Sequence, residues 1–328
     1  LYANGNNDGV NHFVKDCCIA KKFNFNATDL LNSIYDNSNW VTFLNPEVDI
    51  DFFYKQDGLY IIHYIDQSSI NARYDSITVT KHVTQYKNML NASYKSFSLD
   101  SSHFSDFNER MLSYFNCLNG NWLLSVINQT KVKIREKMSL VAACILMKQF
   151  MRRAGGMVWV PISLEDILRV TGSIGLPMNS LFSKKSLDIK GRLSDDLLMM
   201  GLDDSDHNNI RLYIYPVEVK YAQNNSVVKN GEEQVVKTYN AFKENIIDGK
   251  GFRRNIYATF FASQFLTNAD KFSANGRLSP EEKERIDNCR YELLNLRFTM
   301  PSHVPEEMLG NAAIVYFSDQ PEVKQKFN

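Results

Sequence analysis

Cysteine is scarce in this sequence, and its spacing does not suit a cross-link or a metal ligand. The five cysteines are Cys17, Cys18, Cys117, Cys144 and Cys289. Their number is odd and no Cys-x-x-Cys pair occurs, which argues against a disulfide framework and against a zinc knuckle. We therefore expect a protein of a reducing compartment.

Long apolar runs are missing as well. The longest run, residues 140–147, is much shorter than the roughly 20 apolar residues that a membrane-spanning helix needs. No signal peptide is recognisable at the start of the sequence, and we expect no membrane partner. Because the chain begins at Leu1 rather than at methionine, we also expect it to be a piece of a longer protein.

Neither sign of charge predominates. Lys and Arg together number 37, Asp and Glu together number 37, and the formal net charge is zero. Nucleic-acid-binding proteins often carry a basic excess, which this chain lacks, although a local basic groove can coexist with acidic surfaces elsewhere. The 328 residues are enough for one large domain or two ordinary ones.

Alternating and helical patterns predict an α/β protein that divides near residue 128. In residues 1–128 we expect strands at 40–44, 59–64 and 76–80, and helices at 27–35, 82–96 and 103–118. In residues 129–328 we expect a helix at 131–153, a short apolar run at 157–160 stopped by Pro161, and a helix beginning near Ser163. Strands at 197–202, 211–219 and 312–317 and helices at 231–247, 254–266 and 280–290 follow.

Two neighbouring strands carry the most informative polar side chains. Asp196 directly precedes the apolar strand at 197–202, and Glu218 and Lys220 close the next strand. Glu218 and Lys220 point to the same face because strand side chains alternate. If the two strands pair as a hairpin, Asp196 lies beside them. Asp195 is the alternative acidic residue, and we favour Asp196 because it adjoins the apolar run.

This combination of residues suits phosphodiester hydrolysis. Two carboxylates bind a hard cation such as Mg²⁺ through oxygen, and the metal acidifies a bound water and offsets charge on the phosphate. A lysine can orient the water or stabilise the negative transition state. The alternative is an exposed strand end with a solvated Glu–Lys pair; the apolar residues before Lys220 argue against it, because they indicate an internal strand.

Asp196, Glu218 and Lys220 together resemble the Asp … Glu-x-Lys motif of the PD-(D/E)XK nucleases. The resemblance implies a restriction-endonuclease-like core of αβββαβ order in the second half. It also implies Mg²⁺, for which Mn²⁺ can substitute, held by Asp196 and Glu218. Gln234, followed by Tyr239, is similar to the Gln…Tyr element of the RecB-type branch, and an ordinary helical glutamine is the alternative interpretation.

Short segments in about residues 40–80 and 160–240 also resemble the C-terminal part of the DptH/DndH family. These are large ATPase-containing restriction proteins of bacterial DNA phosphorothioation systems, and the similar segments include Tyr-Pro-Val-Glu-Val-Lys at 215–220. The resemblance implies a cytoplasmic bacterial protein that restricts DNA lacking the sulfur modification, together with other subunits of a restriction complex. The chain contains no Gly-x-x-x-x-Gly-Lys-[Ser/Thr] loop, so we do not expect ATPase activity in it.

Further candidates come from the preceding helix and loop. Many PD-(D/E)XK nucleases use a glutamate from their first core helix, and Glu165 is the candidate here, with Asp166 and Glu136 as alternatives. Acidic residues at a helix start also act as caps that compensate the helix dipole. The loop at 171–194 carries four basic residues that either bind DNA phosphates without reading sequence or remain in solvent. They are Lys184, Lys185, Lys190 and Arg192.

We therefore expect a Mg²⁺-dependent DNA endonuclease module in residues 129–328. Residues 1–128 would form an α/β domain that docks partners or lies beside an ATPase. The alternative function is a non-catalytic DNA-binding or assembly module on a nuclease-like fold, because a fold does not determine a function. The intact set of Asp196, Glu218 and Lys220 favours the enzyme, and the zero net charge favours the alternative.

Overall fold

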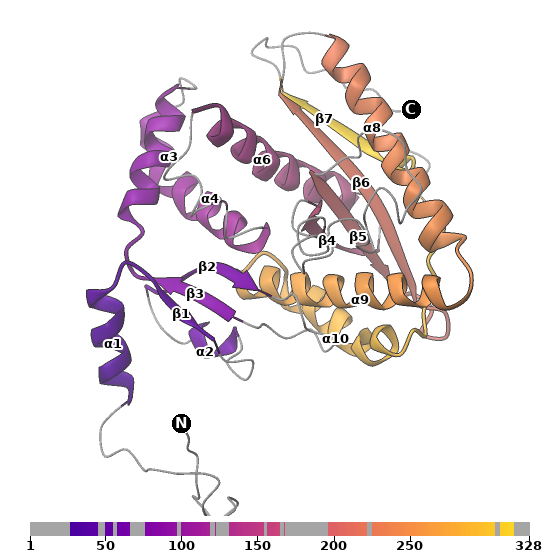
Figure 1. Ribbon diagram of the computed structural model, residues 1–328, viewed down its shortest axis with the longest axis horizontal. Coiled ribbons are helices and arrows are strands. Elements are labelled where there is room, and N and C mark those ends of the chain that lie inside the picture. Colours follow the sequence, from indigo (N-terminus) through magenta and orange to yellow (C-terminus); the bar gives the residue numbers. More distant parts are fainter. Residues whose placement is uncertain are drawn as a thin grey trace, which may run out of the picture.

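The computed structural model of the protein contains two separate β-sheets with helices packed against them (Figure 1). It describes residues 27–44, 50–54, 58–65, 76–96, 100–118, 122, 131–153, 156–164, 167, 196–221, 225–305 and 309–317. Both helices and strands occur in each half of the chain, so the α/β class expected from the sequence is confirmed.

A small sheet lies in the first half of the chain. Its strands are β1 (Val41–Phe43), β2 (Tyr60–Ile65) and β3 (Ser76–Thr80), which pair antiparallel in the order β1-β3-β2. Helices α1 (Ala27–Asn37) and α2 (Asp51–Tyr54) belong to the same part of the chain. A small apolar core holds these elements together, and its buried residues are Tyr35, Ile50, Phe53, Ile77 and Val79.

Three helices connect this sheet to the second half of the chain. They are α3 (Thr84–Ser96), α4 (Phe104–Leu118), which follows the short helix η1 (Ser101–His103), and α6 (Lys131–Arg153). Buried side chains of α3 and α4 belong to the same large core as those of α6 and of the second sheet. The domain boundary near residue 128 stays a prediction, and apolar packing continues across that position.

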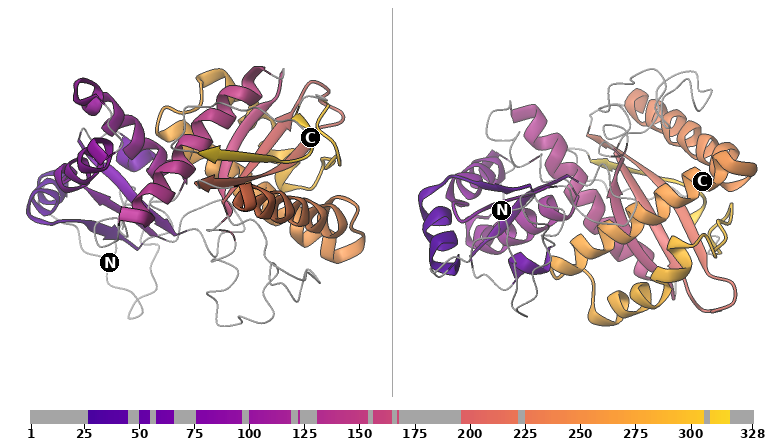
Figure 2. Two further views of the ribbon diagram at one scale, coloured as in Figure 1. Left: turned by 90° about the horizontal axis from the view of Figure 1, so that it is seen from above. Right: turned by 60° about the horizontal axis from the view of Figure 1, so that its bottom comes forward.

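The second sheet has four strands and contains the residues of the expected site. The strands are β4 (Val158–Ser163), β5 (Leu197–Asp203), β6 (Arg211–Tyr221) and β7 (Ala313–Phe317), in the order β4-β5-β6-β7. The first three pair antiparallel, and β7 runs parallel to β6. Helices lie on both faces of this sheet (Figure 2), which explains why every residue from 197 to 202 is buried.

The chain between β6 and β7 is mainly helical. It forms α8 (Asn225–Phe242), the π-helical turn η2 (Lys243–Ile247), α9 (Gly251–Ala274) and α10 (Pro280–Leu294). α10 begins with a capping box, in which the side chain of Ser279 accepts the N–H of Glu282 and the Glu282 carboxylate accepts the N–H of Ser279. Within the described residues, no helix combines the length and the apolar character that crossing a membrane would require.

The short apolar run expected to stop at Pro161 belongs to a strand that continues to Ser163, so the expected stop is wrong. Pro161 pairs with Met199 inside β4. Because β4 is the first strand in the order of the sheet, it has a neighbour on one side only among the described strands. A proline fits in such a strand because its missing N–H needs no partner on the open side.

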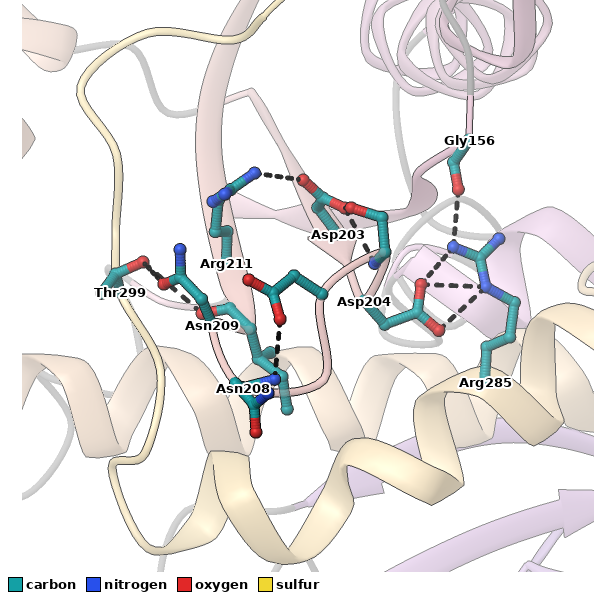
Figure 3. Close-up of polar contacts among 11 residues, drawn as sticks. Gly156, Asp203, Asp204, Asn208, Asn209, Arg211, Arg285 and Thr299 are labelled. Atoms are coloured by element: carbon teal, nitrogen blue, oxygen red, sulfur yellow. Dashed lines mark hydrogen bonds and ion pairs between the residues drawn. The ribbon is translucent and has the colours of Figure 1, made fainter.

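The turn between β5 and β6 is tied to distant parts of the chain (Figure 3). Arg285 of α10 donates from Nε to both carboxylate oxygens of Asp204, at 3.1 Å each, and from a terminal nitrogen to the carbonyl of Gly156 at 2.6 Å. Arg211 donates to Asp203 at 3.1 Å across the first pair of the hairpin. The backbone of Thr299 exchanges hydrogen bonds of 2.9 Å with Ile210 and Leu212. These contacts fix the hairpin register at the end opposite to Asp196.

Candidate active site

The hairpin register brings Asp196 to the end of β6. Leu197 pairs with Val217, so the residue before Leu197 lies across from the residue after Val217. The carboxylate of Asp196 accepts a hydrogen bond from the backbone N–H of Val219, with 2.7 Å between Oδ2 and N. Asp196 is thus held at the backbone of Val219, the residue between Glu218 and Lys220.

This contact has a simple cause in the lengths of the two strands. β6 continues to Tyr221, but its pairing with β5 ends at Val217, so a backbone N–H beyond this point has no strand partner in β5. A buried N–H group needs an acceptor, and the carboxylate of Asp196 supplies one. The carbonyl of Asp196 also accepts the N–H of Leu164 at 3.1 Å, which joins the end of β4 to the same point.

Glu218 is a fully buried carboxylate, with none of its side chain exposed. Its Oε1 forms an ion pair with Nζ of Lys220, whose side chain is 23% exposed. Among the residues that the structure describes, no donor is aligned to form a hydrogen bond with either carboxylate oxygen of Glu218. Burying a carboxylate is unfavourable unless it is paired and well hydrogen-bonded, so this arrangement leaves acceptor capacity for a further positive or proton-donating group.

Gly231 of α8 allows the helix to lie directly against these two side chains. A Cβ at this position would be 3.3 Å from Cγ of Lys220 and 3.5 Å from Cγ of Glu218. Glycine inside a helix costs about 0.5–1 kcal/mol relative to alanine. The close approach of helix and strand explains its presence here. The sequence interpretation placed Gly231 at the start of this helix, whereas α8 begins at Asn225.

Gln234 lies one turn further along α8 and lines a cavity together with Lys220. Tyr239 is buried and its hydroxyl donates to the carbonyl of Ser302. Burial raises the pKa of Tyr239, so its hydroxyl stays protonated as a donor. The structure therefore brings Gln234 to Lys220 and gives Tyr239 a structural contact.

Several expected site residues lie outside the described part of the chain. They are Glu165, Asp166, Asp195, Lys184, Lys185, Lys190 and Arg192. Glu136 is exposed on α6, and its carboxylate is 3.9 Å from Nζ of Lys137.

Asp196 and Glu218 are the described carboxylates at this site. In the described ranges, no group of three or more His, Cys, Asp or Glu side chains is arranged to hold a metal ion. Two carboxylates still suit a cation that takes oxygen ligands and keeps several waters, as Mg²⁺ does. The buried oxygens of Glu218 that lack aligned donors fit such a ligand.

Sequence reasoning missed two residues of this region, Gly231 and Lys237. Gly231 had a usable signal, because an isolated glycine within a helical pattern often marks close packing. Lys237 has no signal in the sequence, since its place in the same cavity as Lys220 depends on how α8 lies across the strand. Comparisons of the chain with protein-family models, curated proteins and solved structures gave no match.

Proposed function

We propose that the chain is a Mg²⁺-dependent deoxyribonuclease of the PD-(D/E)XK type that hydrolyses phosphodiester bonds. One observation carries the proposal: the Asp196 carboxylate accepts the N–H of the residue between Glu218 and Lys220. The order α6, β4, β5, β6, α8 and β7, with β7 parallel to β6, supports it, because it corresponds to the αβββαβ arrangement with η2, α9 and α10 added between α8 and β7. The resemblance in the sequence supports a role in a bacterial restriction complex in the cytoplasm.

Asp196 and Glu218 would hold the cation in this proposal. Bound there, Mg²⁺ would lower the pKa of a coordinated water and offset the charge of the attacked phosphate. Asp196 is held in place by the N–H of Val219, and Glu218 is held by burial and by Lys220. Both carboxylates are therefore oriented by the sheet before any substrate arrives, which is how a site avoids reorganisation during the reaction.

Lys220 would act on the water or on the transition state. Its ammonium group contacts Glu218, and the exposed part of its side chain lets it reach a phosphate oxygen at the same strand end. A lysine in this place can orient the attacking water and stabilise the negative charge that develops on the phosphate. Gln234, in the same cavity wall, would assist by hydrogen bonding to the substrate.

The test is cleavage of supercoiled plasmid with Mg²⁺ or Mn²⁺. We expect nicking or linearisation that stops when the metal is chelated and that is lost in Glu218→Ala and Lys220→Ala. The matched controls are Glu244→Ala and Lys229→Ala, which alter exposed residues of the same types outside the site. Urea unfolding of each variant separates loss of chemistry from loss of folding.

Two results would count against the enzyme. Cleavage that persists in both site variants would remove Glu218 and Lys220 from the reaction. Duplex binding without any cleavage, even after the partner subunits are added, would favour the non-catalytic DNA-binding or assembly module instead.

A further inference from the structure

A cavity of about 360 Å³ lies beside the candidate active site. Its volume is within the range of about 300–1,000 Å³ that is usual for ligand sites. One wall is Lys220 of β6. The other is a side of α8 that presents one basic group, one acidic group, two amides and one apolar residue. The α8 residues are Val227, Asn230, Glu233, Gln234 and Lys237.

The cavity follows one side of α8 away from Lys220. Val227, Asn230, Gln234 and Lys237 are spaced by three, four and three residues, which places them along one stripe of a helix. Lys237 is six residues beyond Gly231, where the helix meets Lys220, so the two points are about 9 Å apart along the helix axis. A chain molecule bound at Lys220 can therefore continue along this stripe.

The α8 wall carries one cation, Lys237, and one anion, Glu233, so its net charge is zero and a phosphate would have to replace Glu233 at Lys237. Lys237 contacts Glu233 with 3.9 Å between Nζ and Oε2, and these side chains are 46% and 57% exposed. Exposed ion pairs of this kind contribute little to the stability of a helix. Lys237 can thus exchange Glu233 for a phosphate at small cost. The amides of Asn230 and Gln234 can donate to phosphate or sugar oxygens, and Val227 offers an apolar contact to a sugar.

We propose that this cavity binds the DNA backbone beside the scissile phosphate, and that Lys237 holds a flanking phosphate of the same strand. The inference rests on the proposed function, which places the scissile phosphate near Lys220. The separation of about 9 Å along α8 is well above the rise of about 3.4 Å for one nucleotide, so Lys237 would meet a phosphate other than the scissile one. Lys237 is then a positioning residue that sets where the strand lies, and it takes no part in the bond cleavage.

The experiment measures binding of a short fluorescent duplex in EDTA at several salt concentrations. We expect Lys237→Gln to weaken binding about three- to tenfold and to reduce the salt dependence by the equivalent of about one phosphate contact. Glu233→Gln should strengthen binding, because it removes a negative charge and releases Lys237. The matched control, Lys229→Gln, alters an exposed lysine of α8 that does not line the cavity, and it should change binding less than Lys237→Gln.

Equal effects of Lys237→Gln and Lys229→Gln would overturn the inference, as would weaker binding by Glu233→Gln or no DNA binding by the wild type. A binding assay without metal also separates this inference from the proposed function. If the wild type never cuts plasmid but Lys237→Gln alone loses affinity, the nuclease proposal fails and the backbone site stands. If the wild type cuts plasmid and Lys237→Gln binds DNA normally, the nuclease proposal stands and the backbone site at Lys237 fails.

Discussion

The hydrogen bond from Val219 to Asp196 allows the structural and chemical roles of this carboxylate to be separated. Its N···O distance of 2.7 Å is at the short end for bonds to a charged acceptor. Such bonds contribute about 1.5–3 kcal/mol, and an unpaired buried N–H costs a similar amount. Asp196→Ala removes the acceptor, so we expect the free energy of unfolding to fall by about 2 kcal/mol.

Asp196→Asn keeps an acceptor oxygen but removes the charge. A neutral hydrogen bond contributes about 0.5–1.5 kcal/mol, so Asn keeps much of the contribution of Asp at this contact. We therefore expect Asp196→Asn to unfold within about 1 kcal/mol of the wild type. Plasmid cleavage should fall in both variants, by about 10²- to 10³-fold, because a positioned electrostatic group has been lost.

The assay pairs urea denaturation with plasmid cleavage on the same preparations. We expect stability to decrease in the order wild type, Asp196→Asn, Asp196→Ala, and cleavage to be lost in both variants. Wild-type cleavage by Asp196→Asn would show that this carboxylate serves the fold alone. Equal destabilisation by Asn and Ala would refute the reasoning about the Val219 hydrogen bond.

Two further predictions concern α8 and the core. Gly231→Ala places a methyl group 3.3 Å from Cγ of Lys220. We therefore expect plasmid cleavage to fall about tenfold, while the free energy of unfolding changes by less than about 1 kcal/mol. Val236→Ala on the exposed side of α8 is the control, and unchanged cleavage by Gly231→Ala would contradict the prediction. Burial raises the pKa of the Cys144 thiol from 9.0 to about 12, so the stability linked to this thiol is complete below pH 9 and is lost as the pH rises toward 12. Urea unfolding between about pH 9.5 and 10.5 should show a decline that is shallower in Cys144→Ala by about 1.4 kcal/mol per pH unit, and identical declines would show that the thiol titrates normally.

Strands and helices with a regular apolar pattern along their length could be predicted from the sequence. The strand at residues 76–80 and the helix at 131–153 have the expected bounds, and the β5–β6 hairpin pairs as its apolar runs and polar turn suggested. This pairing brought Asp196 to Glu218 and Lys220, because a hairpin register depends on local sequence. The part of the site that the two strands carry could therefore be predicted from the sequence.

The parts that depend on contacts between distant elements were not predictable. α9 was expected to end at residue 266 but continues to Ala274, since polar residues there are stabilised by tertiary partners. Asp270, for example, accepts a hydrogen bond from Arg290 at 2.7 Å, and burial raises its pKa. The cavity along α8 likewise arises from the way the helix crosses β6, which no pattern within α8 records.

Pro161 also bears on how the sheet behaves toward other chains. An edge strand presents unpaired backbone groups that can recruit a strand from another molecule, and proline is one of the residues that prevent this. At Pro161 an incoming strand would find no N–H to pair with, in the middle of β4. The sheet is therefore protected on this border against intermolecular strand addition, the first step of many aggregation reactions. Among the described strands, β7 lies at the other border and carries no proline, so it lacks this particular protection.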